Sequence, residues 1–461
     1  MLMKQLLAEI LQRVKPTKNE LSEEKRVIRA LLGKIKKIRG KHVGAAVYGS
    51  VGRGTQLAGD RDIDIFVMFP KELSREEFET EGLRIAKTVF RGHPFIEAYS
   101  EHPYLKCDYN GFDIEIIPAY RVSHPRHKLS AVDRTPFHHR YLQQRLSARQ
   151  KDDVRLLKKF FKGIGVYGAD VRHNGFSGYA TELLILQYKT FPHAVARIAK
   201  WRTPVIIDHE HRQSPSNLVQ RYANAPLILI DPTDEQRNVG AAVTDSTMRQ
   251  TIAAAKAFLK KPDARFFFPN KPKAVSAIKL SKQLRRHPVL GLETAFDPHL
   301  HEDIFWGQLQ HFTQKIAHQF AQHGFEVERF ECYSDHQRQS VVFFELNTLK
   351  LPMLMQRTGP PVDNEPHVQR FLETHRGKIK KQTVRNGHVL ITVPRENTDA
   401  VRLFKRIVAE LIKTEKKPIQ EILAKHHRVL DESSISEKYA KPTPFRDFAT
   451  RFIYQKPIWK N

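Results

Sequence analysis

One stretch of the chain, residues 47–69, limits the possible folds more than any other. It is predicted to form a strand, a glycine-rich turn and a second strand. The second strand alternates, with Asp62 and Asp64 on one face and a row of isoleucine and valine side chains on the other. The turn between the two strands contains Gly49, Gly52, Gly54 and Gly59. These glycines permit the tight backbone that a turn close to a phosphate requires.

The two aspartates have the spacing of metal ligands. Carboxylates at positions i and i+2 of a strand lie roughly 7 Å apart at the backbone. Both can therefore reach one pair of divalent ions that are about 4 Å apart. The alternative interpretation is a half-buried strand with a polar face beside a glycine loop. That alternative does not explain why the polar face consists of acids in a chain with 50 acidic and 77 basic residues.

Charge indicates the class of partner. The chain has 461 residues and a formal net charge of +27. A protein this basic most often binds a polyanion, and nucleic acid is the first candidate. A membrane surface is the alternative, but the basic residues are spread along the chain and no apolar run approaches the ~18 residues of a membrane span. We therefore expect nucleic acid and no membrane as partner.

The two cysteines, Cys107 and Cys332, are far apart in the sequence. They indicate no disulfide framework and are compatible with a reducing compartment. A cytoplasmic location is the expectation that follows.

A second alternating strand, residues 111–120, offers a third acid. Asp113 and Glu115 lie on one face, and Ile114 and Ile116 on the other. Two divalent ions carry four positive charges, so a third carboxylate on a neighbouring strand is what a two-metal site needs. Taken alone, the segment could equally be an ordinary edge strand.

Helix boundaries are predicted from capping residues. Residues 1–42 are expected to form two helices, the second beginning at Asn19 or Ser22 and ending near Gly40. The segment Thr135-Pro-Phe-His-His139 is predicted to open another helix, with Thr135 as its N-cap and Pro136 at the first helical position. Free N–H groups at such a helix start suit a triphosphate, although capping alone would explain Thr135. His138 would then lie in the first turn.

The C-terminal part is predicted to be a separate α+β region. Residues 262–273 read as a linker, with Phe266 to Phe268 among prolines and lysines. The expected order is strand 289–295, helix 303–323, strands 325–333 and 341–349, helix 365–376 and strand 388–393. This order predicts a ferredoxin-like unit. Its basic segment 376–381 could follow an RNA backbone.

The Gly49-Ser50 turn, the Asp62-Ile-Asp64 strand and a later acid together resemble the nucleotidyltransferase superfamily, which includes DNA polymerase beta, poly(A) polymerases and CCA-adding enzymes. Within it, the sequence resembles the archaeal-type (class I) CCA-adding enzymes over most of its length. The resemblance also rests on Glu101-His-Pro-Tyr104, Ser130 to His139, Asp153-Val-Arg-Leu-Leu-Lys158, Gly165-Val-Tyr-Gly168, Gly175-Phe-Ser-Gly-Tyr179, Asp231 to Val239 and Arg357-Thr-Gly-Pro360.

The resemblance implies template-independent addition of C, C and A to the 3′ end of tRNA, with CTP and ATP as substrates. It implies two Mg²⁺ ions held by Asp62, Asp64 and Glu115, the three catalytic acids. The family carries Asp at the third position, and Glu115 is one methylene longer, so Asp113 is a second candidate. A homodimer is suggested by the family alone.

The same resemblance implies a nucleotide-binding set. It places Ser50, Arg53, Lys158 and Tyr167 at the triphosphate, and Arg237 at the RNA and the incoming base. Gly49, Thr135 and His138 complete the predicted CTP and ATP site, through the glycine turn and the helix start. A segment with metal-binding residue types, Asp208 to His211, matches no established zinc spacing and is expected to be loop.

Three domains are predicted. Residues 1–140 form the nucleotidyltransferase catalytic head with a mixed, polymerase beta-like sheet. Residues 141–262 form a mainly helical neck that binds nucleotide and RNA, and residues 263–461 form the α+β body and tail that bind tRNA. The fold class is thus multidomain α+β. The alternatives in function are a poly(A) polymerase of similar layout and a non-catalytic RNA-binding protein with a degenerate transferase domain.

Overall fold

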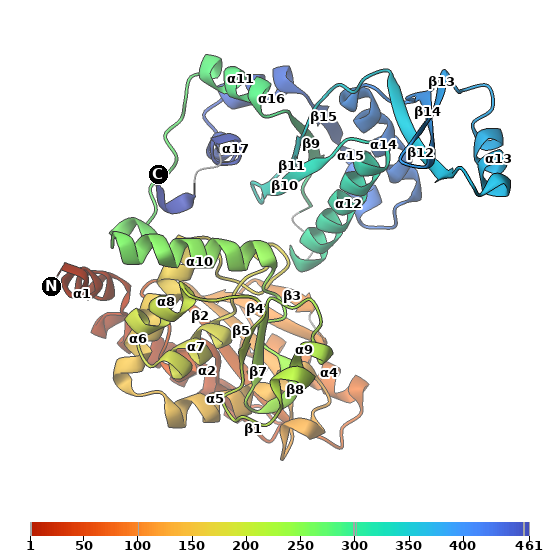
Figure 1. Cartoon of the computed structure of the whole chain (residues 1–461). Coiled ribbons are helices and arrows are strands. Elements are labelled where there is room, and N and C mark those ends of the chain that lie inside the picture. The colour runs from red at the N-terminus through yellow and green to blue at the C-terminus, as the bar shows by residue number, and fades with distance from the viewer. Residues whose placement is uncertain (1, 100, 298–299, 301, 455–456, 461) are drawn as a thin grey trace. The chain divides into compact units, whose positions relative to one another are not determined.

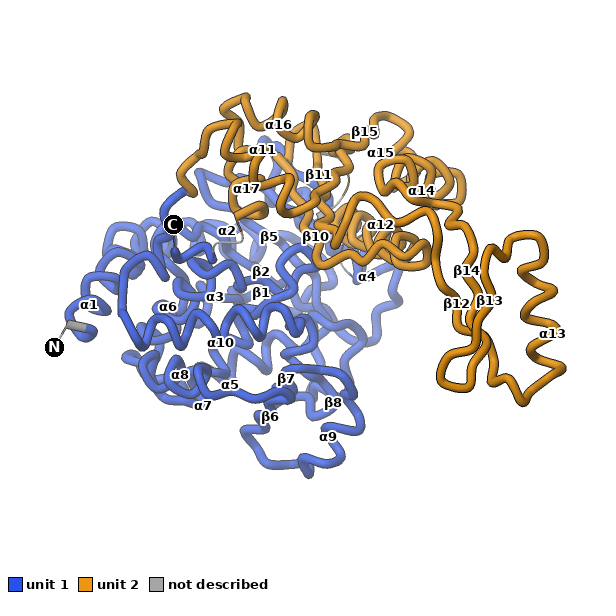
Figure 2. Tube along the Cα trace, turned by 45° about the horizontal axis from the view of Figure 1, so that its top comes forward, with its two compact units in different colours: residues 1–271, 457–461 blue, residues 272–456 orange. Residues whose placement is uncertain are grey.

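The computed structural model describes residues 2–99, 101–297, 300, 302–454 and 457–460. The chain divides into two compact units (Figure 2). Unit 1 comprises residues 1–271 and 457–461, and unit 2 comprises residues 272–456. None of the helices in the described part is long and apolar enough to cross a membrane.

Unit 1 contains the predicted mixed sheet. Its five strands are β1 (Gly44–Val47), β2 (Asp62–Pro70), β3 (Phe95–Tyr99), β4 (Pro103–Tyr109) and β5 (Phe112–Arg121). The spatial order is β1-β2-β5-β4-β3, with β2 and β5 parallel and the other pairs antiparallel. Helices α2 (Lys18–Lys37) and α4 (Arg75–Val89) pack on one face through a core that includes Ile63, Ile65 and Val67. Because strand side chains alternate, Asp62 and Asp64 face the other side.

Helix α2 begins earlier than the sequence prediction. Thr17 is the N-cap, and its hydroxyl accepts a hydrogen bond from the N–H of Glu20. The Glu20 carboxylate in turn accepts one from the N–H of Thr17, which completes a capping box. The predicted starts at Asn19 and Ser22 are therefore wrong, because a better reciprocal cap lies upstream.

The start of helix α5 (Thr135–Arg145) also differs from the prediction. Thr135 is not the N-cap but the first helical residue, with φ −56° and ψ −41°. A 3-10 turn, η2 (Ala131–Arg134), runs directly into the helix, and the N–H of Thr135 donates to the Val132 carbonyl. Because the chain is already helical where α5 begins, the capping interaction lies one turn earlier, between Ser130 and Asp133.

The second part of unit 1 is a helical bundle with a small sheet. Its helices are α1 (Leu2–Val14), α6 (Ala148–Gly163), α7 (Gly178–Tyr188), α8 (Phe191–Ile198), α9 (Pro215–Arg221) and α10 (Asp245–Lys260). Phe160, Phe176 and Phe258 are fully buried in the shared core. The sheet β6 (Val205–Ile207), β7 (Leu227–Asp231) and β8 (Asp234–Asn238) was not among the predicted elements. Phe266 and Phe267, expected in a linker, are buried in this core instead.

Unit 2 has the predicted ferredoxin-like order, but with a different fourth strand (Figure 1). Its antiparallel sheet has the order β10-β11-β9-β15. The elements are β9 (Val289–Ala295), α12 (Glu302–Gln322), β10 (Val327–Ser334), β11 (Gln339–Leu346), α14 (Ala400–Thr414), α15 (Ile419–Lys425) and β15 (His427–Leu430). The prediction that residues 365–376 and 388–393 complete this unit is wrong.

Those two segments belong to a separate layer between β11 and α14. It consists of β12 (Leu354–Pro361), α13 (Glu365–Thr374), β13 (Lys381–Arg385) and β14 (His388–Pro394), with the strand order β12-β14-β13. Val389, Ile391 and Val393 of β14 pack on α13 and form a small core of their own. The apolar face of β14 is therefore buried within the insertion. The strand pairs with β12 and β13 and not with the larger sheet.

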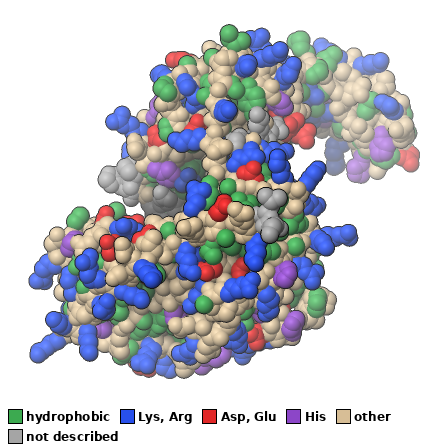
Figure 3. Space-filling view, turned by 90° about the vertical axis from the view of Figure 1, so that its left-hand side faces the viewer, with side chains coloured by type: hydrophobic (Ala, Val, Ile, Leu, Met, Phe, Trp, Pro, Cys, Tyr) green, Lys and Arg blue, Asp and Glu red, His purple; other side chains and the backbone are tan. Residues whose placement is uncertain are grey.

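The last elements of the chain divide between the units. Helices α11 (Ala277–Arg286), α16 (Glu432–Ala440) and α17 (Pro444–Tyr454) share a core in unit 2. The short helix η4 (Ile458–Lys460) belongs to unit 1, where Trp459 stacks on Phe266 with ring centroids 5.8 Å apart. On the face drawn in Figure 3, lysine and arginine side chains are scattered widely instead of gathered in one patch.

Candidate active site

The parallel pairing of β2 with β5 brings the predicted acids side by side. In this register Asp64 lies opposite Glu115, and Asp62 lies opposite Asp113. All four side chains leave the sheet on the face away from α2 and α4. We call these four residues the acid cluster. Both candidates for the third acid are thus present, and Glu115 is the one beside Asp64.

The two aspartates of β2 lie close to other carboxylates, and among the described residues neither forms an ion pair. Burial, followed by the neighbouring charge of Glu115, raises the pKa of Asp64 to about 6. Burial, followed by the charges of Asp60 and Asp113, also raises the pKa of Asp62. Like charges held together in a half-buried site resist ionisation. A bound cation would remove this repulsion, and hard carboxylate oxygens are the donors that Mg²⁺ and similar ions prefer.

Glu115 has a counter-ion of its own within the protein. Lys106 lies opposite Glu115 in the antiparallel register of β4 and β5, and its Nζ is 2.5 Å from Oε1 of Glu115. Burial disfavours the ammonium, but the hydrogen bond to Glu115, the charge of Glu115 and the neighbouring Tyr104 together outweigh it, and the pKa of Lys106 rises to about 12. In the residues that the structure describes, no three Asp, Glu, His or Cys side chains form a ready metal-ligand set. Asp62, Asp64 and Glu115 share one sheet face, with Glu115 paired to Lys106.

The glycine turn is built around Asp64. Gly49 has φ +60°, and a Cβ at this position would lie 1.8 Å from Oδ2 of Asp64. The turn continues as the short helix α3 (Gly49–Arg53), and the N–H of Tyr48 donates to the Asp64 carbonyl. The Ser50 carbonyl accepts hydrogen bonds from the N–H groups that follow α3, at Gly54 and Thr55. Only glycine allows the turn to approach the acid cluster so closely.

Arg53 and Lys158 meet at a buried carboxylate. Glu182 of α7 is fully buried, and its Oε2 lies 2.9 Å from Nε of Arg53. Its Oε1 accepts a hydrogen bond from the Thr55 hydroxyl at 2.5 Å and lies 4.0 Å from Nζ of Lys158. Lys158 also donates to the Thr55 carbonyl at 3.1 Å. With Tyr167, these residues form what we call the Glu182 cluster.

Burial sets the protonation behaviour of the Glu182 cluster. Burial lowers the pKa of Lys158 to about 8, although the charge of Glu182 opposes this. Burial would raise the pKa of Glu182, but Arg53 and Lys158 hold it below its ordinary value. The pKa of Tyr167 is raised by burial and by the negative charge of Glu182. A Cβ at Gly178 would lie 3.1 Å from the Tyr167 hydroxyl, so this glycine leaves room beside the cluster.

His138 and Arg237 meet at a second buried carboxylate. Oδ2 of Asp231, at the end of β7, lies 2.8 Å from Nε2 of His138 and 2.9 Å from a guanidinium nitrogen of Arg237. Oδ1 accepts a hydrogen bond from the Tyr179 hydroxyl at 3.1 Å. The rings of His138 and Tyr179 are stacked, with centroids 4.1 Å apart. We call these four residues the Asp231 cluster.

The Asp231 carboxylate is held ionised. Burial would raise its pKa, but the hydrogen bond from His138 and the charge of Arg237 keep it well below its ordinary value. Burial lowers the pKa of His138, with Asp231 acting against this. Arg53 acts on both His138 and Asp64 through its charge. It therefore lies within electrostatic reach of all three clusters.

The structure thus brings together most of the predicted residues, and adds three that the sequence reasoning missed. Glu182, Asp231 and Tyr179 organise the cationic groups. Glu182 could have been found as the one acid within an otherwise apolar stretch of α7. Asp231, at the end of a buried strand, gives a weaker signal. Thr135 precedes His138 on α5, but among the described residues no side chain of the three clusters bonds to it.

Three family models match successive parts of the chain. The model described as "Nucleotidyltransferase domain" matches residues 28–138. The model "tRNA nucleotidyltransferase, second domain" matches residues 152–268. The model "CCA-adding enzyme, C-terminal domain" matches residues 294–432. The first two contain the residues of the three clusters.

Relatives named CCA-adding enzyme are similar over most of their length. The chain is 40% identical over 329 residues to the one of Halobacterium salinarum, covering 71% of this chain and 70% of the relative. Over 404 residues it is 34% identical to that of Methanosarcina mazei, covering 86% and 87%. Over 357 residues it is 35% identical to that of Saccharolobus shibatae, covering 77% and 82%.

Proposed function

This chain belongs to the archaeal-type CCA-adding enzymes, and on that premise we infer that it adds CCA to the 3′ end of tRNA from CTP and ATP. It is a nucleotidyltransferase, and the reaction releases pyrophosphate at each step. The observation that carries the assignment of the catalytic centre is the β2–β5 register, which sets Glu115 beside Asp64. The residue roles that follow are proposals.

We propose that Asp62, Asp64 and Glu115 are the catalytic acids and hold two Mg²⁺ ions. Enzymes of this superfamily use divalent metal ions, and three adjacent carboxylates suit a hard cation. The raised pKa values of Asp62 and Asp64 support a site whose balancing charge comes from a ligand. When bound, the ions activate the primer 3′-hydroxyl and stabilise the leaving pyrophosphate. Glu115 is preferred to Asp113 because it is the direct neighbour of Asp64.

The Glu182 cluster is proposed to bind the triphosphate. Arg53 and Lys158 contribute two positive charges against the single charge of Glu182, which leaves the cluster net positive. Hydrogen bonds between such cations and phosphate oxygens are strong. Tyr167 adds a hydroxyl beside Lys158, with Gly178 close to both. Gly49 and Ser50 would border the phosphates through the turn, and Thr135 is retained as a weaker candidate.

The Asp231 cluster is proposed to act on the base and the RNA end. The guanidinium of Arg237 is anchored by Asp231 while 35% of its side chain remains exposed. An anchored, partly exposed guanidinium presents fixed donors to a base, so it can discriminate between bases by hydrogen bonding. His138 shares the same anchor and is proposed to face the nucleotide phosphates.

We propose that the three predicted domains divide the work between catalysis and RNA binding. Residues 1–140 would be the catalytic domain, residues 141–262 the nucleotide- and RNA-binding domain, and residues 263–461 the tRNA-binding domain. The net charge of +27 supports binding of tRNA through its phosphates, so affinity should fall steeply with salt. A cytoplasmic location and a homodimer remain predictions. The free state of Cys107 and Cys332 supports the former.

The test is incubation of tRNA that lacks its 3′ CCA with CTP, with ATP and with both, in Mg²⁺ and then in EDTA. We expect two C residues with CTP alone, completion by one A with both nucleotides, and no addition in EDTA. A long A tail would indicate a poly(A) polymerase. Binding without any addition would indicate a degenerate transferase that only binds RNA.

A further inference from the structure

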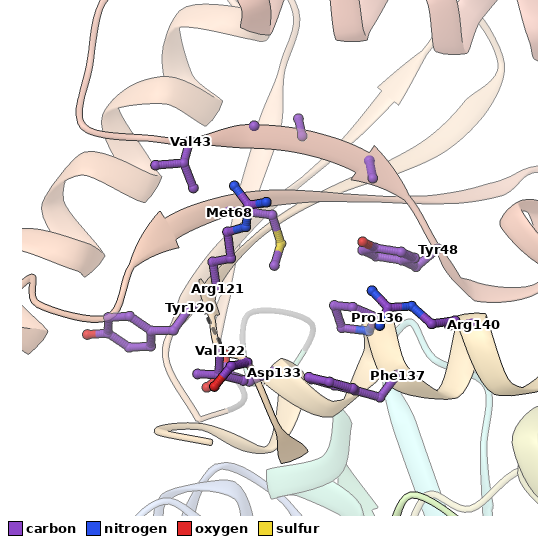
Figure 4. Close-up of a pocket in the computed structure, with 14 residues that line it drawn as sticks. Val43, Tyr48, Met68, Tyr120, Arg121, Val122, Asp133, Pro136, Phe137 and Arg140 are labelled. Atoms are coloured by element: carbon purple, nitrogen blue, oxygen red, sulfur yellow. Dashed lines mark hydrogen bonds between the residues drawn. The ribbon is translucent and has the colours of Figure 1, made fainter. Parts of the chain in front are cut away.

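A cavity of about 400 Å³ lies in unit 1 (Figure 4). Met68 in its wall shows that it lies on the same sheet face as the acid cluster, but farther along the strands. It is formed between β1, the end of β5 and helix α5. Met68 of β2 lines it, four residues beyond Asp64, which corresponds to about 13 Å along a strand. None of the residues that line the cavity belongs to the three clusters.

Two arginines give the cavity its charge. Arg121 at the end of β5 and Arg140 of α5 both line it and are both exposed. Within the described part of the chain neither forms an ion pair, and the guanidinium carbon of Arg140 lies 6.0 Å from the centroid of the Phe137 ring. Most other arginines near the proposed active site, such as Arg53 and Arg237, are paired with a carboxylate.

The one acid in the cavity wall does not offset these charges by pairing with them. Asp133 is fully buried, and its carboxylate accepts hydrogen bonds from the backbone N–H groups of Tyr120, Leu129 and Ser130 and from the Ser130 hydroxyl. Its carboxylate oxygens are thus occupied by hydrogen bonds that stabilise the turn before α5. The cavity keeps two guanidinium groups available for an anion.

Tyr48 and the apolar wall supply the rest of a binding site. Figure 4 shows the Tyr48 ring at one end of the cavity, above Pro136 and Arg140, with Arg121 and Met68 farther along. Tyr48, Arg121 and Arg140 all line this cavity. Burial raises the pKa of Tyr48, and the charges of the two arginines act against this. Strand β1 is an edge of the sheet and contributes only small side chains there, at 44–46. Val43, Met68 and Val122 add apolar side chains to the lining.

We propose that this cavity binds a nucleotide, with its phosphate on Arg121 and Arg140 and its base against the apolar wall beside Tyr48. Guanidinium groups bind phosphate oxygens well, and bases stack on apolar and aromatic surfaces. The volume is in the range of small-ligand sites. The nucleotide is either free or part of an RNA strand, since both present the same chemistry.

A ligand bound in the cavity would act on the catalytic turn through Tyr48. Tyr48 immediately precedes Gly49, and its N–H donates to the carbonyl of Asp64. Its ring packs edge-on against Phe66 and His139, with centroids 5.2 Å apart in each pair. A nucleotide that fixes Tyr48 therefore supports the backbone on which the turn is built.

The experiment compares an Arg121→Gln/Arg140→Gln double variant with wild type and with a control that loses the same charge elsewhere in unit 1. Arg91→Gln/Arg202→Gln is that control, because both arginines are exposed and lie outside the cavity. Binding of labelled AMP is measured by equilibrium dialysis in EDTA. Binding of tRNA lacking CCA is measured by filter retention, and thermal unfolding verifies that each variant is folded.

We expect the cavity variant to lose at least tenfold in affinity for AMP, for tRNA, or for both, while the control stays within about twofold of wild type. Loss of AMP binding alone identifies a free nucleotide, and loss of tRNA affinity alone identifies a nucleotide of the RNA. Tyr48→Phe should weaken the same ligand more modestly, by severalfold. The proposal is overturned if the cavity and control variants bind both ligands equally. Failure of CCA addition in wild type would instead contradict the proposed function.

Discussion

Two groups of carboxylates in unit 1 have pKa values that are shifted in opposite directions. The acid cluster on β2 and β5 is crowded, and the pKa values of Asp62 and Asp64 are raised. Glu182 and Asp231 are more deeply buried, yet their pKa values are lowered because cations surround them. Burial alone thus does not decide the charge state. The protein neutralises Glu182 and Asp231 itself, and it pairs Glu115 with Lys106, but it leaves Asp62 and Asp64 without a paired cation.

The largest effect is expected from Asp64→Asn. It removes a charge from one of the two unpaired aspartates while keeping the shape of the side chain. We expect nucleotide addition to fall by on the order of 10³-fold or more, with tRNA affinity nearly unchanged. Thermal stability should stay level or rise, since a like-charge contact is lost. Single-turnover addition and thermal unfolding measure the two effects, and a marked drop in stability would contradict the proposed difference between the groups.

Glu182→Gln should behave in the opposite manner and lose stability. Breaking a buried ion pair by removing one partner costs roughly 3–5 kcal/mol. Nucleotide addition should fall by on the order of 100-fold in kcat/KM, mainly through KM, because Arg53 and Lys158 lose their anchor. The matched control is Glu235→Gln, which breaks the more exposed pair with Arg126 and should cost at most about 1 kcal/mol. Equal losses in both variants would show that Glu182 is not a special anchor.

Asp231→Asn should affect the choice of base more than the rate. The change keeps a hydrogen-bond acceptor but weakens the hold on Arg237 and His138. We expect roughly a tenfold loss in discrimination between CTP and ATP at each position. Competition of the two nucleotides in one reaction, followed by sequencing of the products, measures it. Unchanged discrimination with slower addition would assign Asp231 a purely structural role.

Lys158 predicts a pH dependence of nucleotide binding. Its pKa of about 8 means that the ammonium is present below this pH and is lost above it. If the ammonium binds phosphate, KM for CTP should rise about eightfold between pH 7.5 and pH 9. Glu182→Gln should move this rise to lower pH, because the carboxylate supports the ammonium. A profile that is flat and identical in both proteins would contradict the role of Lys158.

The smallest effect is expected from Asp113→Asn. Asp113 lies opposite Asp62 at the exposed end of the acid cluster, whereas Glu115 lies opposite Asp64. We expect less than a roughly threefold change for Asp113→Asn and near-complete loss for Glu115→Gln. Steady-state addition of C to tRNA lacking CCA compares them. The reverse order would transfer the third ligand position to Asp113.

Local patterns in the sequence predicted local structure well, and contacts between distant segments less well. The alternation of residues 62–67 was enough to place Asp62 and Asp64 on one face, as the structure confirms. The partner of Asp64 depends on the β2–β5 register, which no single segment contains. The choice between Glu115 and Asp113 therefore stayed open. Similarly, the sequence of α7 alone indicates that Glu182 belongs to a helix packed in the core. Its role as a partner of Arg53 and Lys158 depends on contacts with other elements.

The wrong prediction of the fourth strand in unit 2 also comes from a contact between distant segments. Residues 388–393 do form a strand, as predicted, and in chain order they stand where the fourth strand of a ferredoxin-like unit is expected. The structure assigns them to an insertion, and the true fourth strand is the short β15, at 427–430. A strand of four residues with two basic side chains gives little signal by itself. Its identity comes from pairing with β9, which is a long-range contact.

The return of the chain end to unit 1 has a topological consequence. Unit 2 begins after residue 271 and ends before residue 457, so it is an insertion between two segments of unit 1. Trp459, packed on Phe266, fastens the second segment. A protease that cuts once near residue 272 would therefore leave unit 2 covalently joined to η4 and retained through that contact.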